Sequence, residues 1–515
     1  MIEARTFWEL VDRRAAATPD ALMGLDESLR TMTFGGYRDA AEGLAAALYA
    51  GGVTAGTPVS WILPTRFDAL ILMAALARLG AVQIPILPIY RHREVGFCLR
   101  ETGARTVIVP AAYKDFSHAG MVRELAADLG GLTVIEFGDA LPCADPAALP
   151  PPPSSGDEVR WIFYTSGTTG SPKGARHTDR GVLESSVGMA RAMDLGPHDR
   201  IALVFPVTHL GGANSLTAAL FSGAGHLVVD AFFAPGVLDF LAAHGVTHAG
   251  AGTVFHQAYL AAQRARGDGP IFPAIRVFQG GGAPKPPQLH YDLKREIGGA
   301  GILSVYGMTE CPIISLGRIG DPDEKLAYTE GQFNTPGTEY RVVDPDSGAE
   351  VAAGGVGELL LRAPQLCKGY VDESLNRDAF TADGFFRTGD LVRIDDGGNL
   401  IIVGRQKDVI IRKGENIAPL EIEQLLMRHP KVADVAVIGL PEEERGELCC
   451  AVVVTAGDEP ITLAEMRSYL EGEKLMKQKI PEQLELVAAL PKNPTGKVLK
   501  KDLKGQFSAR VPARA

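Results

Sequence analysis

The sequence predicts an α/β protein in which a large N-terminal domain of layered α/β subdomains is followed by a small α+β domain. Three observations predict this arrangement. Strand-like apolar runs alternate with helical stretches in the first part of the chain, short strands punctuated by Gly and Asp follow from about Thr338, and the pattern changes again after Gly404. At 515 residues, the chain is too long to fold around a single hydrophobic core, and its apolar content of 46% is sufficient to form several cores.

The first part of the chain alternates between the two kinds of element. Residues 67–80 (FDALILMAALARLG) predict an apolar helix, and residues 81–85 a short buried strand ending at proline. Similar strands are expected at residues 106–109, 201–205, 226–229, 275–278 and 302–306. Such alternation favours largely parallel sheets. Residues 149–156, with four successive prolines, predict a surface loop.

The later part of the chain differs in its sequence pattern. Residues 355–362 and the turn-forming residues 395–399 (DDGGN) indicate an antiparallel, barrel-like unit. Beyond it, a helix over residues 419–429 and strands over 432–438 and 447–455 predict a small α+β domain. We find no internal repeat.

Composition excludes several classes of function. A net charge of -11 argues against a nucleic-acid ligand, which would need a basic footprint. No run of eighteen uncharged apolar residues and no signal-peptide pattern occurs, so we expect a cytoplasmic protein without an integral membrane segment. The six cysteines show no CxxC spacing, which predicts reduced, mostly buried thiols and no zinc site.

The most informative segment is a loop at residues 164–174, with the sequence YTSGTTGSPKG. Glycines let backbone N–H groups turn toward phosphate oxygens, hydroxyl groups donate further hydrogen bonds, and Lys173 adds a charge. The apolar residues 160–164 before it predict a buried strand that delivers the loop to a sheet edge. The order Lys-Gly differs from a Walker A motif. A solvated linker is the alternative, although linkers rarely follow a strand.

Further motifs follow in a fixed order: GGGAP at 280–284, YGMTE at 306–310, TGD at 388–390, GRQKD at 404–408, KGEN at 413–416 and PKNPTGK at 491–497. With the loop, they make the chain, from about residue 33 to 501, resemble the adenylate-forming (ANL) superfamily, in its acyl-CoA synthetase or fatty acid–CoA ligase branch. The resemblance implies the ANL fold, which includes a distorted β-barrel and a mobile C-terminal domain. It implies an N-terminal ATP- and acyl-binding domain at residues 1–404, a hinge at 405–407 and the mobile domain at 408–515.

The resemblance also implies an activity and its cofactors. The expected reaction is ATP-dependent ligation of a small carboxylic acid to coenzyme A through an acyl-adenylate, with Mg²⁺ as the metal ion and release of AMP and pyrophosphate. The polyphosphate would be held by Thr165, Ser166, Gly167, Thr168, Thr169, Gly170 and Lys173. Thr309 would bind the α-phosphate, and Glu310 would ligate Mg²⁺, which suits a carboxylate.

The remaining roles are carried over in the same way. An adenine slot would be formed by Gly281, Gly282, Ala283 and Tyr306, and Gly307 beside them would also bind the cofactor. Asp390 would accept from the ribose, Arg405 would donate to ribose or phosphate, and Lys497 would bridge the carboxylate and the α-phosphate. His209 would lie beside the substrate carboxylate. After a domain rotation about Lys407, the pantetheine tunnel would be lined by Lys413 and Gly414.

Each position also has a purely structural interpretation. Thr309 and Glu310 could cap a helix N-terminus, His209 could be a satisfied core histidine, and Asp390 an ordinary turn residue. Lys497 could be a solvated loop lysine, and Gly414 a plain turn.

The sequence leaves the identity of the carboxylic acid substrate open. The acyl pocket would be lined by His209, Gly212, residues 251–254, Gln279, Gly280, Met308 and Ile313. None carries a full charge to pair with an ammonium group, which disfavours amino acids and favours an uncharged aliphatic or cyclic acid. Chain length and aromatic or steroid-derived acids remain open, as does the oligomeric state, a homodimer included. The alternative activities are an acyl-AMP ligase that loads a separate carrier protein, a luciferase-like oxygenase and a noncatalytic nucleotide-binding homologue.

Overall fold

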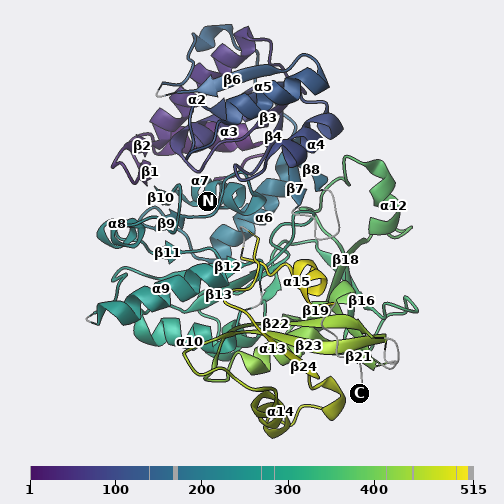
Figure 1. The fold of residues 1–515 in the computed structure, drawn as a ribbon. Coiled ribbons are helices and arrows are strands. Elements are labelled where there is room, and N and C mark those ends of the chain that lie inside the picture. Colours follow the sequence, from purple (N-terminus) through teal and green to yellow (C-terminus); the bar gives the residue numbers. More distant parts are fainter. Residues whose placement is uncertain are drawn as a thin grey trace.

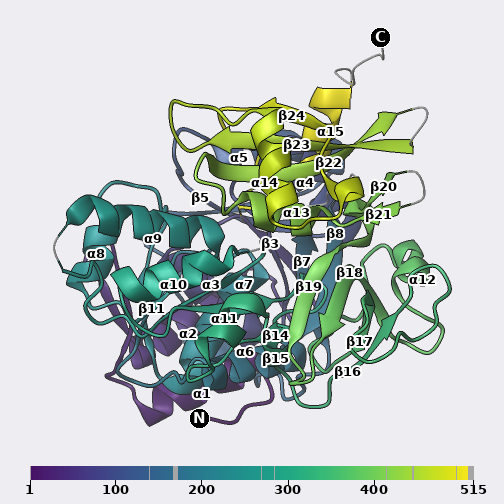
Figure 2. The same ribbon diagram turned by 90° about the horizontal axis from the view of Figure 1, so that it is seen from below.

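The computed structural model describes residues 2–138, 140–165, 172–267, 269–283, 285–412, 415–442, 446–493 and 496–508. Within these residues, four sheets and their helices form a large N-terminal part and a smaller C-terminal unit, which lies to one side of it (Figures 1 and 2).

The first sheet has the order β6-β5-β3-β4-β7-β8 and lies at the top of Figure 1. All its neighbours pair in parallel except β7 and β8. Its strands are β3 (Pro58–Trp61), β4 (Val82–Pro85), β5 (Thr106–Pro110), β6 (Thr133–Phe137), β7 (Val159–Thr165) and β8 (Lys173–Thr178). Its helices include α2 (Phe34–Ala50), α3 (Phe67–Leu79), α4 (His92–Thr102) and α5 (His118–Leu129), with η1 (Pro146–Ala148) before β7.

The second sheet has the order β15-β14-β13-β12-β11-β9-β10-β1-β2, parallel from β13 to β1. Its strands are β1 (Leu22–Asp26), β2 (Thr31–Thr33), β9 (Arg200–Leu203), β10 (Gly225–Val228), β11 (His248–Ala249), β12 (Val277–Gly281), β13 (Ile302–Tyr306), β14 (Ser315–Leu316) and β15 (Gln332–Phe333). The helices of this region are α1 (Phe7–Ala17), α6 (Asp179–Ala192), α7 (Leu210–Ser222), α8 (Val237–Ala243), α9 (Thr253–Arg266), α10 (Pro287–Glu296) and α11 (Asp323–Tyr328). These two sheets confirm the predicted layered, largely parallel architecture.

One apolar cluster joins the two sheets and contains almost every residue of α3. This explains why the sequence of that helix is apolar on all sides, since a helix packed between layers has no solvent face. Gly80 ends the helix in the left-handed conformation, with φ of 69°, which glycine adopts without strain.

The barrel-like unit is an antiparallel sheet with the order β16-β17-β18-β19. It was predicted from short strands separated by Gly- and Asp-rich turns. Its strands are β16 (Glu339–Val343), β17 (Gly357–Arg362), β18 (Phe386–Ile394) and β19 (Leu400–Arg405), with η2 (Glu373–Leu375) and α12 (Asn376–Ala379) between β17 and β18. The predicted turn at residues 395–399 joins β18 to β19. Its Asp395 carboxylate accepts backbone hydrogen bonds from Gly397 and Asn399.

The C-terminal unit begins beyond the short helix η3 (Gln406–Asp408). Its strands are β20 (Ile410–Arg412), β21 (Glu415–Ile417), β22 (Val432–Glu442), β23 (Gly446–Thr455) and β24 (Gln483–Leu486), and its helices are α13 (Pro419–Leu426), α14 (Leu463–Gly472), η4 (Lys477–Lys479) and α15 (Lys500–Phe507). Its two apolar clusters use only residues from Ile410 onward. The unit therefore has a core of its own, as expected for a separate α+β domain.

Two further observations bear on the sequence predictions. All six cysteines are free thiols, and only Cys143 is exposed. In the part of the chain that the structure describes, no helix has the length and apolar character needed to cross a bilayer.

Candidate functional site

The predicted phosphate loop joins the ends of two paired strands. β7 and β8 are antiparallel neighbours, with Thr165 opposite Lys173, so the strand predicted to deliver the loop is confirmed. The Lys173 backbone N–H donates to the Thr165 hydroxyl (3.4 Å), and its ammonium lies 5.4 Å from the centre of the Tyr370 ring. Five of the predicted phosphate ligands lie outside the described residues: Ser166, Gly167, Thr168, Thr169 and Gly170.

Thr309 and Glu310 follow β13 in a bend, not in a helix, so the helix-cap interpretation is wrong. The carbonyl of Thr309 accepts from Nε2 of His177 (2.7 Å), whose pKa burial lowers to about 4, so the ring is neutral near pH 7. The Tyr370 hydroxyl donates to Oε1 of Glu310 (2.6 Å).

Tyr370 therefore joins the phosphate-loop lysine to the predicted metal ligand, a role that the sequence analysis missed. It lies between β17 and β18, about sixty residues from Glu310 along the chain. A single tyrosine after a glycine carries no pattern that would single it out. Its contacts with Glu310 and Lys173 arise only from the tertiary fold.

The predicted base slot forms where β12 and β13 end side by side. A Cβ at Gly281 would lie 1.8 Å from the carbonyl oxygen of Val305, so only glycine fits there. Gly282 has a φ of +81°, and a Cβ at Gly307 would lie 2.5 Å from the backbone nitrogen of Ile313. Gly281, Gly282, Ala283, Tyr306 and Gly307 thus share this edge of the sheet.

The opposite wall of the site comes from the four-stranded sheet. Asp390 on β18 is nearly fully buried and pairs in register with Arg405 on β19. Its carboxylate accepts from the Tyr306 hydroxyl (2.8 Å) and from Nε of Arg405 (2.9 Å). Burial, followed by the Asp390 charge, raises the pKa of Tyr306, so its hydroxyl stays protonated. Asp390 is therefore part of a buried network rather than a turn.

The C-terminal unit brings Lys497 to this network. Its backbone N–H donates to Asn493 Oδ1 (2.9 Å), and a Cβ at neighbouring Gly496 would lie 2.8 Å from a methyl group of Val254 on α9. Burial, then the charges of Arg405 and Lys407, lower the pKa of Lys497 to about 8. The solvated-loop interpretation of Lys497 is therefore wrong.

Lys407, in η3, belongs to the same cluster of charges. Burial lowers its pKa, followed by repulsion from Arg405, and Lys173 adds to this repulsion. Four cations from three segments of the chain, Lys173, Arg405 with Lys407, and Lys497, thus converge beside the two acids Asp390 and Asp408. Such a concentration of positive charge on a chain of net charge -11 suits a polyanionic ligand. Lys413 and Gly414 lie outside the described residues.

His209 is the N-cap of α7, where its Nδ1 accepts from the Gly211 backbone N–H (3.1 Å). Its ring packs edge-on against Phe205, with the ring centres 4.7 Å apart. Burial lowers its pKa to about 4, so the imidazole is neutral at physiological pH. The residue is partly exposed rather than enclosed in the core.

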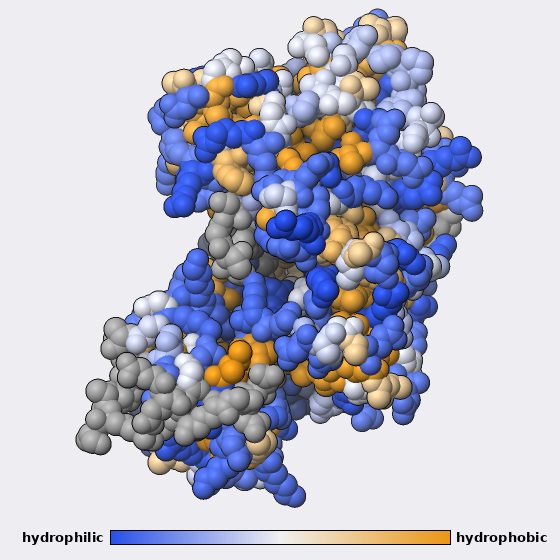
Figure 3. Space-filling view, turned by 90° about the vertical axis from the view of Figure 1, so that its right-hand side faces the viewer, coloured by the Kyte–Doolittle hydropathy of each residue, from blue (hydrophilic) through white to orange (hydrophobic). Residues whose placement is uncertain are grey.

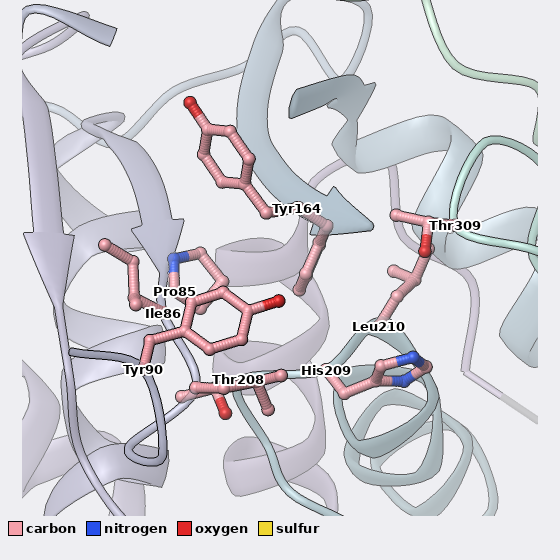
Figure 4. Close-up of a pocket in the computed structure, with 10 residues that line it drawn as sticks. Pro85, Ile86, Tyr90, Tyr164, Thr208, His209, Leu210 and Thr309 are labelled. Carbon is pink, nitrogen blue, oxygen red and sulfur yellow. The ribbon is translucent and has the colours of Figure 1, made fainter. Parts of the chain in front are cut away.

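A small hollow lies between His209 and Thr309 (Figure 4). Figure 4 shows the Tyr90 ring extending across it from the side of Pro85 and Ile86. Its lining is otherwise Leu87, Phe163, Tyr164, Thr208 and Leu210. Of the predicted acyl-pocket residues, only His209 lies here, while Thr253 and Gly280 line a second hollow.

Comparison with known proteins identifies the family of the chain. A family model described as AMP-binding enzyme matches residues 11–371, and one described as AMP-binding enzyme C-terminal domain matches residues 421–497. The chain belongs to the AMP-binding enzyme family. The resemblance to the adenylate-forming superfamily is thereby confirmed.

Relatives of this AMP-binding enzyme differ in the acid that their names give. A salicyl-AMP ligase / salicyl-S-ArCP synthetase of Mycobacterium tuberculosis is 34% identical, over 98% of this chain and 91% of that protein. A long-chain-fatty-acid–CoA ligase of the same species is 32% identical, over 98% and 99%. The solved structure of ATP-bound MatB from Rhodopseudomonas palustris is 28% identical, covers 97% of this chain and 99% of that one, and has a TM-score of 0.87.

Proposed function

We propose that this AMP-binding enzyme is an ATP-dependent carboxylic acid–CoA ligase. It converts an acid into an acyl-adenylate with release of pyrophosphate, and then into an acyl-CoA thioester with release of AMP. The observation that carries the proposal is the convergence of Lys497, Arg405 and Asp390 beside the base slot, although they come from two separately folded parts of the chain. A convergence of this kind supports positioning of a nucleotide against a second substrate.

The first half-reaction depends on position and charge. An oxygen of the substrate carboxylate must attack the α-phosphorus in line while pyrophosphate departs. Lys497 would bridge the carboxylate and the α-phosphate, Thr309 would bind that phosphate, and Lys173 would hold the departing phosphates. Preorganised cations stabilise the charge of the transition state without reorganising at that moment.

Glu310 has the chemistry of a magnesium ligand. Tyr370 engages Oε1, and each carboxylate oxygen has more than one lone pair, so the group retains oxygen sites for a metal ion. Mg²⁺ is commonly bound by one or two carboxylates together with substrate phosphates. A metal ion bound there would neutralise phosphate charge, while Tyr370 holds the carboxylate in one orientation.

The second half-reaction needs a thiol at the acyl carbonyl, where Lys497 lies in the adenylating arrangement. We infer that residues 408–515 rotate about Lys407 relative to residues 1–404, which removes Lys497 and brings Lys413 and Gly414 to the site. The separate apolar clusters of the C-terminal unit support this, because a unit with its own core can move without unfolding. Figure 3 shows a notch between the lower lobe, which contains this unit, and the upper lobe.

The expected acid is uncharged apart from its carboxylate. The hollow beside His209 and Thr309 is lined by apolar, aromatic and hydroxyl side chains, and its histidine is neutral. An additional buried charge on the substrate would lack a partner there, which is costly. Aliphatic, cyclic and aromatic acids all meet this condition.

The proposal is tested by incubating the pure protein with MgATP, CoA and a panel of straight, branched, cyclic and aryl acids. AMP and thioester should form in equal amounts with at least one acid. AMP production without loss of free CoA thiol, across the whole panel, would exclude the CoA ligase.

A second candidate is an acyl-AMP ligase that transfers the acyl group to a separate carrier protein. The 34% identity to a salicyl-AMP ligase / salicyl-S-ArCP synthetase favours it. Both candidates share the adenylation step, so only the acceptor separates them. Transfer of salicylate or another aryl acid to a phosphopantetheinylated carrier protein, with free CoA inert, would favour this second candidate.

A further inference from the structure

The segment of β18 that carries Asp390 is a bulge in the four-stranded sheet. The pairing of β17 with β18 shifts register between Glu358 and Leu360, so that only Leu359 on β17 stands opposite residues 388–390 on β18. These three residues are the TGD motif, and we call them the TGD bulge. Extra residues in one strand interrupt the ladder and re-aim a side chain, and such bulges are common beside active sites.

Side chains supply hydrogen bonds that the interrupted ladder does not. The Thr388 hydroxyl donates to the carbonyl oxygen of Leu359 (2.8 Å) and accepts from the backbone N–H of Asp390 (3.1 Å). The backbone N–H of Gly389, the middle residue of the bulge, donates to Oε1 of Glu358 (3.3 Å). Main-chain N–H groups away from water need such partners, so these side chains determine which conformation of the TGD bulge is stable.

Glu358 joins two points of this segment. Its Oε2 accepts from Nη1 of Arg387 (3.1 Å), the residue just before the bulge, while Oε1 holds the Gly389 N–H. The Glu358 side chain is 4% exposed, and a buried carboxylate is costly unless cations and N–H groups are paired with it. Hydrogen bonds to an ionised acceptor are stronger than those between neutral groups. One buried carboxylate therefore fixes the start and the middle of the TGD bulge.

The conformation of the bulge decides where the Asp390 carboxylate lies. Gly389 has a φ of +68°, which turns the chain just before Asp390 and which glycine adopts without strain. The Asp390 carboxylate then reaches Tyr306 on β13, in the neighbouring sheet, and Arg405 on β19. An aspartate side chain is short, so a change in the main chain of the bulge would move this carboxylate away from the base slot.

We propose that Glu358 is a positioning residue for nucleotide binding, because its carboxylate holds the TGD bulge in the conformation that directs Asp390 to the ribose hydroxyls. The inference rests on the proposed function, which assigns those hydroxyls to Asp390. Glu358 acts through the main chain of Gly389 and not by touching the nucleotide. A carboxylate that is already in place when the ribose arrives costs less to order on binding than one on a mobile segment.

The test measures nucleotide binding by titration calorimetry with Mg²⁺ and without any acid, so ligase activity is not the readout. The ligands are ATP and its 2′,3′-dideoxy analogue, which lacks both ribose hydroxyls. The wild-type protein should bind ATP roughly tenfold or more tightly than the analogue, the scale of one hydrogen bond to a charged group. Glu358→Leu keeps the volume of the side chain but has no acceptor. It should lose most of this preference, with the affinity for the analogue changed by less than about twofold.

Two further variants separate positioning from a general loss of structure. Glu358→Gln retains an amide oxygen that can accept from the Gly389 N–H, so it should keep the preference for ATP to within about threefold. Glu339→Leu is the matched control, because the exposed Glu339 on β16 pairs with Arg362 (2.6 Å) in the same sheet. It should bind both nucleotides as the wild-type protein does.

A double-mutant cycle tests whether Glu358 acts through Asp390. Asp390→Asn alone should weaken ATP binding, and adding Glu358→Leu to it should weaken binding by less than about twofold more, since the group that Glu358 positions has already been altered. Two residues that contribute independently would instead give losses that multiply.

Each contrary result has a distinct meaning. Equal wild-type affinity for the two nucleotides, a preference for ATP that survives in Glu358→Leu, or losses that multiply in the cycle would overturn the inference and leave the proposed function intact. If Glu358→Leu does not fold, the nearly isosteric Thr388→Val removes another support of the same bulge and should abolish the preference, and a retained preference would equally overturn the inference. A wild-type protein that binds neither nucleotide would sink the proposed function as well.

Discussion

Lys497 provides the sharpest test of the site. Its ammonium is partly buried beside Arg405 and Lys407, and its pKa is lowered to about 8 from the 10.5 of an unperturbed lysine. Adenylation needs the charged form. Because a lowered pKa causes proton loss at lower pH, kcat/KM for ATP should be nearly flat below pH 7 and fall above it, by about tenfold between pH 7 and pH 9. The unperturbed lysine would lose almost no charge over that range.

Removing the side chain should separate the two half-reactions. Lys497→Ala should lower adenylate formation by roughly 100-fold or more, the effect of deleting one preorganised charge, while thioester formation from supplied acyl-adenylate survives. Lys492→Ala is the matched control, because Lys492 lies in the same loop but pairs with Asp434 (2.6 Å). Pyrophosphate exchange measures the first step and loss of CoA thiol the second. Equal losses in both steps, or a wild-type profile that stays flat to pH 9.5, would refute the assigned role.

Three further substitutions test the hinge, the ribose ligand and the metal ligand. Lys407→Pro fixes φ near -65° at the pivot, so adenylation should remain and thioesterification should be abolished; full overall turnover would contradict the rotation. Asp390→Asn removes the charge that Tyr306 and Arg405 share, and should raise KM for ATP by roughly tenfold or more; an unchanged KM would remove Asp390 from the nucleotide site. Glu310→Gln should increase the Mg²⁺ concentration needed for half-maximal pyrophosphate exchange, with no change in thermal stability in the absence of nucleotide; an unchanged Mg²⁺ dependence would contradict the assignment.

The sequence predicted the sheets well where local pattern and tertiary packing agree. The strand predicted at 302–306 is β13 without adjustment, and the apolar helix predicted at 67–80 is α3, ending one residue earlier at Leu79. Both are predominantly apolar segments in which almost every residue is buried. Boundaries shifted where glycine was involved: β12 begins at Val277 and continues to Gly281, later than the predicted 275–278.

The shift in β12 has a steric reason. Glycine weakens a predicted strand because it lacks a side chain, yet Gly280 and Gly281 pair with Ser304 and Val305 in a parallel ladder. A Cβ at Gly280 would lie 2.6 Å from the backbone of Ala251. The glycines are there because neighbouring backbones approach closely, a requirement that local propensity does not contain.

The sequence motifs indicated which residues belong to the candidate site. They did not indicate the hydrogen bonds and ion pairs that join those residues. Sequence order could suggest that Tyr306, Asp390 and Arg405 act together, but the hydrogen bonds that join them depend on two sheets meeting. The same holds for the hollow beside His209, whose lining adds residues from the end of β4 and the loop after it and from β7 that the sequence did not single out, and includes only His209 of the residues predicted to line the acyl pocket. Contacts of such long sequence separation carry no local signal.

The central claim is that one cleft joins a nucleotide to an organic acid. Exchange of labelled pyrophosphate into ATP, measured with Mg²⁺ in the absence of CoA, tests it most directly because it reports only the reversible adenylation step. The account predicts exchange that depends on an added acid and disappears in Lys497→Ala. Exchange that no acid in a broad panel can elicit from folded protein that binds ATP would contradict it.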